Sequence, residues 1–339
     1  MSVLTYPEMI VVGLLQGVSE LFPVSSLGHS VLVPGLIGGS WARDLDMSAK
    51  GSPYLDSLVA MHVATAAALV IFFWRDWVRI IGALFGSIRH RRISTPDERL
   101  AWLLVVATIP VGIAGLALDK VMREYLGKPV PAAVFLLLNG IVLFTVERLQ
   151  RTRRATAAAR TPGPGAASRR DIGEQPTMVM PAVAARGPAR DVANQPTTRM
   201  RAVSADEASD ARLARLGWWE AIAIGACQIL ALLPGISRSG ATMAGGLLRG
   251  LRHDDAARFA FLLATPVIAA AGMLKVPELA RPEMHGAIGP TLVGSLVAGV
   301  GAYFSVRFLV RYFQTRTLTP FAIYCVIAGL GCLAYFTLT

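Results

Sequence analysis

The chain has 339 residues, of which 54% are hydrophobic and 16% charged, and its mean hydropathy is +0.52. A soluble domain of this length needs more charged surface, so the composition excludes that class and indicates a membrane protein with several spans. The net charge of +11 would suit nucleic-acid binding, but the basic residues stand between apolar runs. Such clusters are typical of cytoplasmic loops near anionic lipid, and we expect no nucleic-acid partner.

Eight apolar regions follow one another along the chain. Two of them are interrupted in the middle: region 9–36 at residues 23–26, and region 218–248 at residues 234–240. The other six are long enough to cross a membrane, because a spanning helix needs about 20 mainly apolar residues. In chain order they are 55–74, 100–118, 131–147, 259–276, 287–306 and 320–338. We therefore predict an all-α polytopic membrane protein with six transmembrane helices and two re-entrant helical hairpins.

The order of these regions indicates an internal repeat, because an interrupted hairpin followed by three spans occurs twice. We expect residues 1–148 to form the first repeat, 149–216 a disordered cytoplasmic linker, and 217–339 the second repeat. The linker is rich in Ala, Arg, Pro and Gly, so it cannot bury enough surface to offset its ordering entropy. Each half has an odd number of spans, which predicts repeats of inverted topology.

Arginines predict the orientation of the chain. They are concentrated in residues 75–99, 148–154 and 307–316. With six spans, all three segments fall on one side, which the positive-inside rule makes cytoplasmic. The first hairpin is then expected to open outward and the second inward, so that their tips meet within the membrane.

The two interruptions predict a polar cavity between the halves, since non-helical backbone at membrane depth needs protein or water to satisfy its polar groups. The first tip offers an acid, an amide, hydroxyls and an imidazole: Gln16, Glu20, Ser25, Ser26 and His29. The second offers residues at the start of a new helix: Ser237, Arg238, Ser239, Gly240 and Thr242. Free N–H groups at a helix start and a guanidinium both favour an anion, so the set suits phosphoryl transfer on a lipid-borne phosphate.

Some of these residues also have a structural interpretation. Glu20 could serve only as the ion-pair partner of Arg238, and His29 could be a hydrogen-bonded residue at a helix start. For Ser25 and Ser239 we favour helix capping or backbone hydrogen bonding. His62, within span 55–74, could line the cavity, but we favour a packing role.

Four other residues are assigned structural roles. Gly13 and Gly17 form a small-residue face at helical spacing and are expected to pack against a neighbouring helix. Asn139 is expected to hydrogen-bond between helices, and His253 is expected to lie in a loop.

Two motifs resemble those of the bacterial undecaprenyl-diphosphate phosphatases, the bacitracin-resistance family. They are Gln16-Gly-Val-Ser-Glu20 with Pro23-Val-Ser-Ser26-Leu-Gly-His29, and Pro234-Gly-Ile-Ser237-Arg238-Ser239-Gly-Ala-Thr242. The resemblance covers both halves and implies a multi-pass phosphatase of the bacterial plasma membrane, with its active site facing outward. Members of this family hydrolyse undecaprenyl diphosphate to undecaprenyl phosphate and inorganic phosphate. This reaction recycles the lipid carrier for peptidoglycan synthesis and confers bacitracin resistance. The partners are this lipid substrate and membrane lipid, and a homodimer is left open.

The resemblance also implies a divalent metal ion, Mg²⁺ or Ca²⁺. We assign Glu20 as its ligand and give Gln16 a weak or indirect role, because many members have glutamate there. The expected catalytic residues are Glu20, Ser26, His29 and Arg238, with Ser26 as nucleophile and His29 as its base and later acid. The expected substrate-binding residues are Gln16, Ser25, Ser237, Arg238, Ser239, Gly240 and Thr242.

Two alternatives remain open at this point. A water molecule activated by the metal could attack the phosphate directly, with Ser26 only binding it. The chain could also be a polyprenyl-phosphate transporter or flippase, because inverted repeats with broken helices are typical of transporters.

Overall fold

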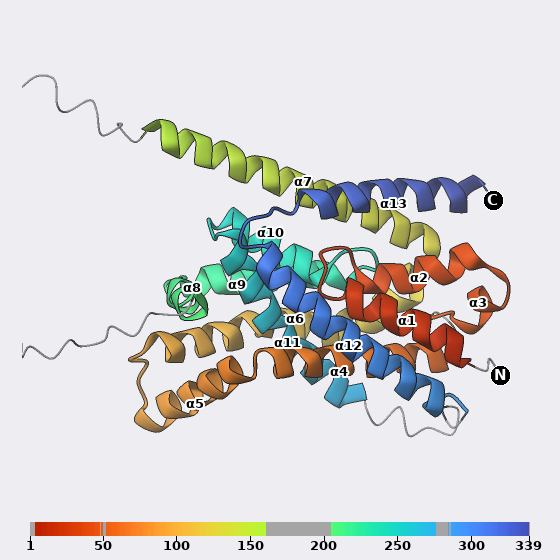
Figure 1. The fold of residues 1–339 in the computed structure, drawn as a ribbon, viewed down its shortest axis with the longest axis horizontal. Helices are drawn as coiled ribbons and strands as arrows, with labels where there is room; N and C mark the ends of the chain where they lie inside the picture. The colour runs from red at the N-terminus through yellow and green to blue at the C-terminus, as the bar shows by residue number, and fades with distance from the viewer. Residues whose placement is uncertain are drawn as a thin grey trace, which may run out of the picture.

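The computed structural model describes residues 4–47, 49, 52–160, 205–275, 284 and 286–338. Throughout this part of the chain the regular elements are helical (Figure 1). In chain order they are α1 (Tyr6–Ser19), α2 (Ser26–Ile37), α3 (Gly39–Asp44), α4 (Pro53–Phe72), α5 (Trp74–His90), α6 (Pro96–Leu126), α7 (Pro129–Arg160), α8 (Ala205–Leu213), α9 (Trp218–Ala226), the 3₁₀ helix η2 (Cys227–Leu232), α10 (Arg238–Leu248), α11 (His253–Lys275), α12 (Ile288–Tyr312) and α13 (Thr319–Leu338).

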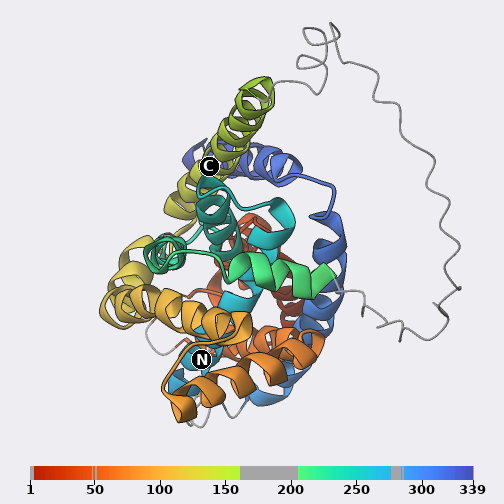
Figure 2. The ribbon, with the colours of Figure 1, turned by 90° about the vertical axis from the view of Figure 1, so that its left-hand side faces the viewer.

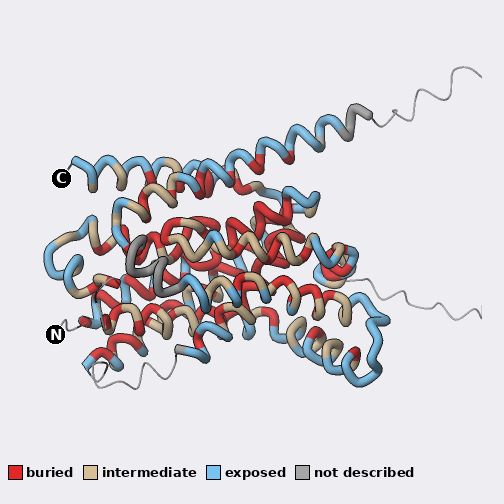
Figure 3. The backbone as a smooth tube through the Cα atoms, turned by 180° about the vertical axis from the view of Figure 1, so that it is seen from behind, coloured by how far each residue is buried: buried red, intermediate tan, exposed pale blue. Residues whose placement is uncertain are grey.

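Six of the described helices are long and apolar enough to cross a membrane, which confirms the predicted all-α polytopic class. The candidate spans are Pro53–Phe72, Pro96–Leu118, Pro129–Arg153, His253–Leu274, Ile288–Tyr312 and Thr319–Leu338. With a rise of about 1.5 Å per residue, helices of this length match a hydrocarbon layer about 30 Å thick. Buried residues concentrate in the middle of the bundle, whereas α13 and the distal part of α7 are mostly exposed (Figure 3).

The two halves pack against each other in a crossed pattern. Helix α1 lies along α12, and α9 lies along α6, so the first helix of each interrupted hairpin contacts the second span of the other half. A Cβ atom added to Gly17 would collide with the backbone of Ala298, and one added to Gly225 with the backbone of Ala107. Gly13 makes the same close approach to α12, which confirms the packing role predicted for both glycines of α1. Small residues of this kind let helix backbones approach closely.

The prediction of a disordered linker over residues 149–216 is wrong at both of its ends. Helix α7 continues to Arg160, and helix α8 packs on α6 and α11 with Asp210 and Leu213 buried. The remaining linker residues, 161–204, lie outside the described part of the chain. The composition of 205–213 is polar, but charged partners elsewhere in the fold compensate for the burial of this helix.

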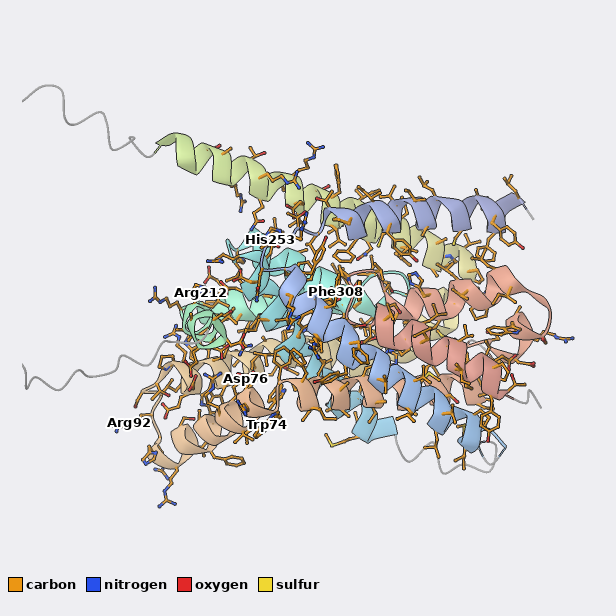
Figure 4. All side chains as sticks on the ribbon, in the orientation of Figure 1. Trp74, Asp76, Arg92, Arg212, His253 and Phe308 are labelled. Carbon is orange, nitrogen blue, oxygen red and sulfur yellow. The ribbon has the colours of Figure 1, made fainter. Side chains whose placement is uncertain are left out.

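These partners form a buried ion-pair cluster. The guanidinium of Arg258 on α11 contacts the Asp210 carboxylate at 2.7 and 2.9 Å and the Asp76 carboxylate of α5 at 2.9 Å. Arg79 also contacts Asp210. The side chains of Arg258 and Asp210 are 6% and 2% exposed, and buried charges are tolerated only when paired in this way. Asp76 and Arg212 mark this region in Figure 4.

The interpretation of His253 as a loop residue is wrong. It is the first residue of α11 and is buried, with Nε2 2.8 Å from a carboxylate oxygen of Glu147 on α7 (Figure 4). The pair joins a span of the first half to a span of the second.

Helix α5 occupies most of the segment that was expected to be a basic loop. Its exposed apolar residues follow one face of the helix: Trp74, Val78, Ile81, Phe85 and Ile88. Arginines flank this face, and such a helix is typical of the membrane interface. Helices α5, α8 and the end of α7 lie at one end of the bundle, opposite the start of α1 and the end of α13 (Figures 1 and 2). The cytoplasmic orientation of that end stays a prediction.

Candidate active site

The first interruption lies between α1 and α2 and is stabilised by Ser25. This residue has φ 69°, in the left-handed region that non-glycine residues seldom adopt. Its hydroxyl oxygen accepts the N–H of Gly28 at 3.1 Å and the N–H of Gly235 at 3.2 Å. The first bond caps α2, as we expected, and the second joins this tip to the tip of the other half.

The second tip lies between η2 and α10, and its serines contact the first tip. The hydroxyls of Ser237 and Ser239 donate to the carbonyl of Phe22 at 3.3 and 3.2 Å. Ser237 also caps α10, because its Oγ accepts the Gly240 N–H at 3.1 Å. Gly235 has φ 111°, and an added Cβ would collide with the backbone of α7. The tip therefore requires glycine at this position.

Asn139 on α7 holds both tips at once. Its Nδ2 donates to the carbonyl of Pro23 at 3.1 Å, and its Oδ1 accepts the Ser237 N–H at 3.1 Å. The side chain is buried, with 3% exposure. The predicted interhelical hydrogen bonding of Asn139 is confirmed, and it satisfies backbone groups that the helix breaks leave free.

The Glu20 carboxylate lies at the centre of the candidate site. Its Oε2 accepts hydrogen bonds from Gln16 Nε2 at 2.9 Å and from the Ser26 hydroxyl. The same oxygen lies 3.2 Å from His62 Nε2, while Oε1 lies 3.7 Å from Arg238 Nη2. The Glu20 side chain is 4% exposed, whereas those of His62 and Arg238 are 20% and 25% exposed. Two partners of the buried carboxylate, His62 and Arg238, are thus partly exposed.

Two polar atoms of this cluster lack a protein partner. Gln16 Oε1, an acceptor, and Arg238 Nη1, a donor, are buried without a hydrogen bond to any described residue. Leaving a buried polar group unpaired costs about 1–3 kcal/mol, so native proteins seldom do so without a ligand or water. The free acceptor suits a cation and the free donor suits an anion.

His62 lies in the candidate site, whereas we expected it to have only a packing role. Its Nε2 faces Glu20, and its Nδ1 lies 2.7 Å from the carbonyl of Leu58, one turn earlier in α4. The sequence signal was a histidine within an otherwise apolar span, since ionisable groups at such depth are costly and often functional.

The structure does not bring His29 to the Ser26 hydroxyl. His29 Nδ1 lies 2.7 Å from the Ser25 carbonyl, and Nε2 lies 2.7 Å from the hydroxyl of Tyr324 on α13. Both ring nitrogens are therefore engaged, and the carboxylate of Glu20 is the basic group that Ser26 contacts. Tyr324, which the sequence did not single out as a site residue, stacks on the imidazole with ring centroids 5.8 Å apart.

Fewer groups of the second tip are free to bind an anion than we expected from the sequence. The Thr242 hydroxyl donates to the Arg238 carbonyl at 2.8 Å, and the Gly240 N–H is bound by Ser237. The Ser237 N–H is bound by Asn139. The N–H groups of Arg238 and Ser239, in the first turn of α10, remain as the backbone donors for an anion, beside the guanidinium.

An apolar groove of about 580 Å³ lies between α1 and α12 and reaches the first tip. Six of the side chains that line it are Leu14, Val18, Phe22, Val300, Phe304 and Phe308. The rings of Phe22 and Phe308 stack with centroids 5.9 Å apart, and Phe308 is labelled in Figure 4. The carbonyl of Phe22 accepts the two serine hydroxyls of the second tip, so the groove adjoins the polar cluster.

Known proteins match almost the whole length of this chain. A family model described as bacitracin resistance protein BacA matches residues 9–166 and 175–331. The chain is 56% identical to the undecaprenyl-diphosphatase of Mycolicibacterium paratuberculosis over 99% of this chain and 98% of that protein. It is 50% identical to undecaprenyl-diphosphatase 1 of Frankia casuarinae over 99% of each chain, and 36% identical to undecaprenyl-diphosphatase 2 of Chromobacterium violaceum over 95% of each. These matches include both interrupted hairpins.

Proposed function

The chain belongs to the bacitracin resistance protein BacA family, and from this membership we infer that it is a membrane phosphatase that hydrolyses undecaprenyl diphosphate. The products are undecaprenyl phosphate, the lipid carrier that peptidoglycan synthesis reuses, and inorganic phosphate. The relatives are named undecaprenyl-diphosphatases, which supports hydrolysis over the transporter alternative.

The unpaired donor and acceptor beside Glu20 carry this proposal. Arg238 Nη1 can donate to an oxygen of the distal phosphate, and Nη2 already lies 3.7 Å from Glu20 Oε1. A planar guanidinium presents several donors at fixed angles, which suits phosphate oxygens. The N–H groups of Arg238 and Ser239 lie in the first turn of α10, where the helix dipole also favours an anion.

Gln16 and Glu20 are the proposed ligands of a divalent cation. The carboxylate of Glu20 and the unpaired Oε1 of Gln16 belong to adjacent turns of the same helix face, and both are oxygen ligands that Mg²⁺ and Ca²⁺ accept. A bound cation would neutralise charge on the diphosphate oxygens and on the leaving group. These two residues therefore fit the group that the family implies.

Ser26 is the proposed nucleophile, with Glu20 rather than His29 as its base. The Ser26 hydroxyl already donates to Glu20, so the carboxylate can take the proton as Oγ attacks the distal phosphorus. The anhydride P–O bond breaks and undecaprenyl phosphate leaves with the bonding electrons. Water then attacks the phosphorus of the phosphoserine, the P–Oγ bond breaks, and Oγ takes back the proton held by Glu20, while inorganic phosphate keeps the oxygen and protons of the water. Direct attack by water, with Ser26 only binding phosphate, is the second candidate.

The groove between α1 and α12 is the proposed site for the isoprene units nearest the diphosphate. Its lining is apolar and includes Phe22, whose carbonyl contacts the serines next to Arg238. The longer remainder of the prenyl chain would stay in lipid. Helices α1 and α2 extend from the first tip toward the end of the bundle where α1 begins (Figure 1), and we propose that this end faces outward.

Phosphate release by the purified full-length protein in detergent tests the proposal. We expect Arg238→Ala to lose activity on undecaprenyl diphosphate by at least about 10²-fold, because the guanidinium stabilises charge in the transition state. Arg92→Ala, an exposed change at the arginine-rich end, is the control and should keep wild-type activity. Wild-type protein that releases no phosphate, or Arg238→Ala with full activity, would refute the assignment.

A further inference from the structure

We propose that His62 is a direct ligand of the divalent cation, through Nε2, together with Glu20 and Gln16. This inference rests on the proposed function, and it makes the metal centre a mixed nitrogen and oxygen site. A nitrogen ligand favours first-row transition ions over Ca²⁺, which takes oxygen ligands.

The tautomer of His62 follows from its contact with α4. The carbonyl of Leu58 can only accept a hydrogen bond, so His62 Nδ1, at 2.7 Å, carries a hydrogen. In a neutral imidazole the other nitrogen, Nε2, then has a lone pair. That lone pair faces Glu20 Oε2 at 3.2 Å.

Two facing acceptors repel each other unless something positive lies between them. A cation about 2.1 Å from each of two ligands at right angles places those ligands about 3 Å apart, close to the observed separation. Gln16 Oε1, the buried acceptor without a described partner, belongs to the same cluster because its own Nε2 donates to Glu20 Oε2. The three side chains thus provide one nitrogen and two kinds of oxygen ligand.

The hydrogen bond to Leu58 is the arrangement that metal-bound histidines commonly show. A histidine ligand usually donates its second N–H to a carboxylate or a backbone carbonyl, which fixes the ring orientation and raises the basicity of the ligating nitrogen. Among the described residues no cluster of three or more His, Cys, Asp or Glu side chains is preformed. We therefore take the unpaired amide oxygen of Gln16 as the third protein ligand.

The rival explanation is an imidazolium of His62 that forms an ion pair with Glu20, without any metal contact. Both explanations place Nε2 beside the carboxylate, but only the metal explanation places a nitrogen next to a bound ion. Mn²⁺ distinguishes them, because its pulsed electron paramagnetic resonance signal shows ¹⁴N modulation when an imidazole is coordinated.

The experiment uses the full-length protein in detergent with Mn²⁺ as the probe. We expect ¹⁴N modulation in the wild type, its loss in His62→Gln, and Mn²⁺ binding in that variant that is weaker by about tenfold or more. His90→Gln is a matched control: His90 also contacts the carbonyl one turn earlier in its helix, that of Gly86 at 2.8 Å, but it lies exposed on α5. This control should keep the signal.

Two further measurements distinguish a failure of this inference from a failure of the proposed function and from misfolding of the variant. Arg238→Ala should lose phosphate release yet keep the ¹⁴N modulation, so a failure of the proposed function is visible on its own. The melting temperature of His62→Gln without metal should stay close to that of the wild type, which excludes misfolding as the cause of a lost ¹⁴N modulation. Bound Mn²⁺ without ¹⁴N modulation in the wild type, an unchanged signal in His62→Gln, or no Mn²⁺ binding at all would overturn the inference.

Discussion

The hydroxyl oxygen of Ser25 accepts the backbone N–H of Gly235, which lies 210 residues further along the chain. This bond fixes the tips of the two halves against each other. The hydrogen bonds of Asn139, and those of the two serines that contact Phe22, support the same contact. The carboxylate of the first half and the guanidinium of the second meet because of this contact. Neither half has the complete site.

Removal of the Asn139 side chain should weaken the contact between the tips. Asn139→Ala leaves the Ser237 N–H without a partner and the Pro23 carbonyl with only the weak donor of the Cys325 thiol at 3.7 Å, and a buried unpaired group costs about 1–3 kcal/mol. We expect a clear fall in the melting temperature in detergent and a lower kcat. Thr145→Ala, which removes an exposed hydroxyl from the same helix, should change neither; equal melting temperatures for the two variants would contradict the role of Asn139.

Substitution of Ser26 decides between the two chemical routes. With Ser26 as nucleophile, Ser26→Ala should lose turnover by at least about 10³-fold, because nucleophile removal leaves only binding and charge stabilisation. Rapid quenching of the wild type should also trap a phosphoserine. Ser19→Ala, whose hydroxyl donates to the Leu15 carbonyl instead, is the control in α1. Near-normal turnover of Ser26→Ala would establish direct attack by water.

His29 and Tyr324 should matter less than Ser26. Their mutual hydrogen bond supports the contact between α2 and α13 but does not reach the Ser26 hydroxyl. We expect His29→Gln and Tyr324→Phe each to retain turnover within about tenfold of the wild type, below the roughly 10²–10⁴-fold loss that removal of a general base causes. A loss in His29→Gln as large as in Ser26→Ala would restore His29 as the base.

The ion-pair cluster at the arginine-rich end should act on stability rather than on chemistry. Asp210→Ala removes the closest partner of the buried Arg258 guanidinium, which keeps Asp76 at 2.9 Å, so we expect a cost below the ~3–5 kcal/mol of a fully broken buried pair. The melting temperature should fall by several degrees, while kcat per folded molecule stays unchanged. Arg252→Ala breaks an exposed pair with Asp254 and should have little effect. Equal effects of the two changes would argue against the cluster.

The sequence predicted the six spans and both helix breaks, because apolar length and proline positions are local features. It could not predict α8, since the burial of Asp210 depends on Arg258, 48 residues away in sequence. His253 was misassigned for the same reason: its partner, Glu147, is on another span.

Within the site, the sequence named Glu20, Ser26 and Arg238, which the structure brings together. The role of His62 depends on how α4 is rotated about its axis, and periodicity does not fix this rotation in a helix that is apolar nearly all round. The pairing of His29 with Tyr324 depends on the position of the last helix.

A double-mutant cycle on kcat/KM tests most directly whether one site is shared by the two halves. Glu20→Gln, Arg238→Gln and the double variant are compared with the wild type in phosphate release from undecaprenyl diphosphate. Residues that act as a unit are strongly non-additive, so we predict that the double variant loses about as much activity as the worse single variant. If the fold losses in kcat/KM of the two single variants multiply in the double variant, as for two independent sites, the shared site is contradicted.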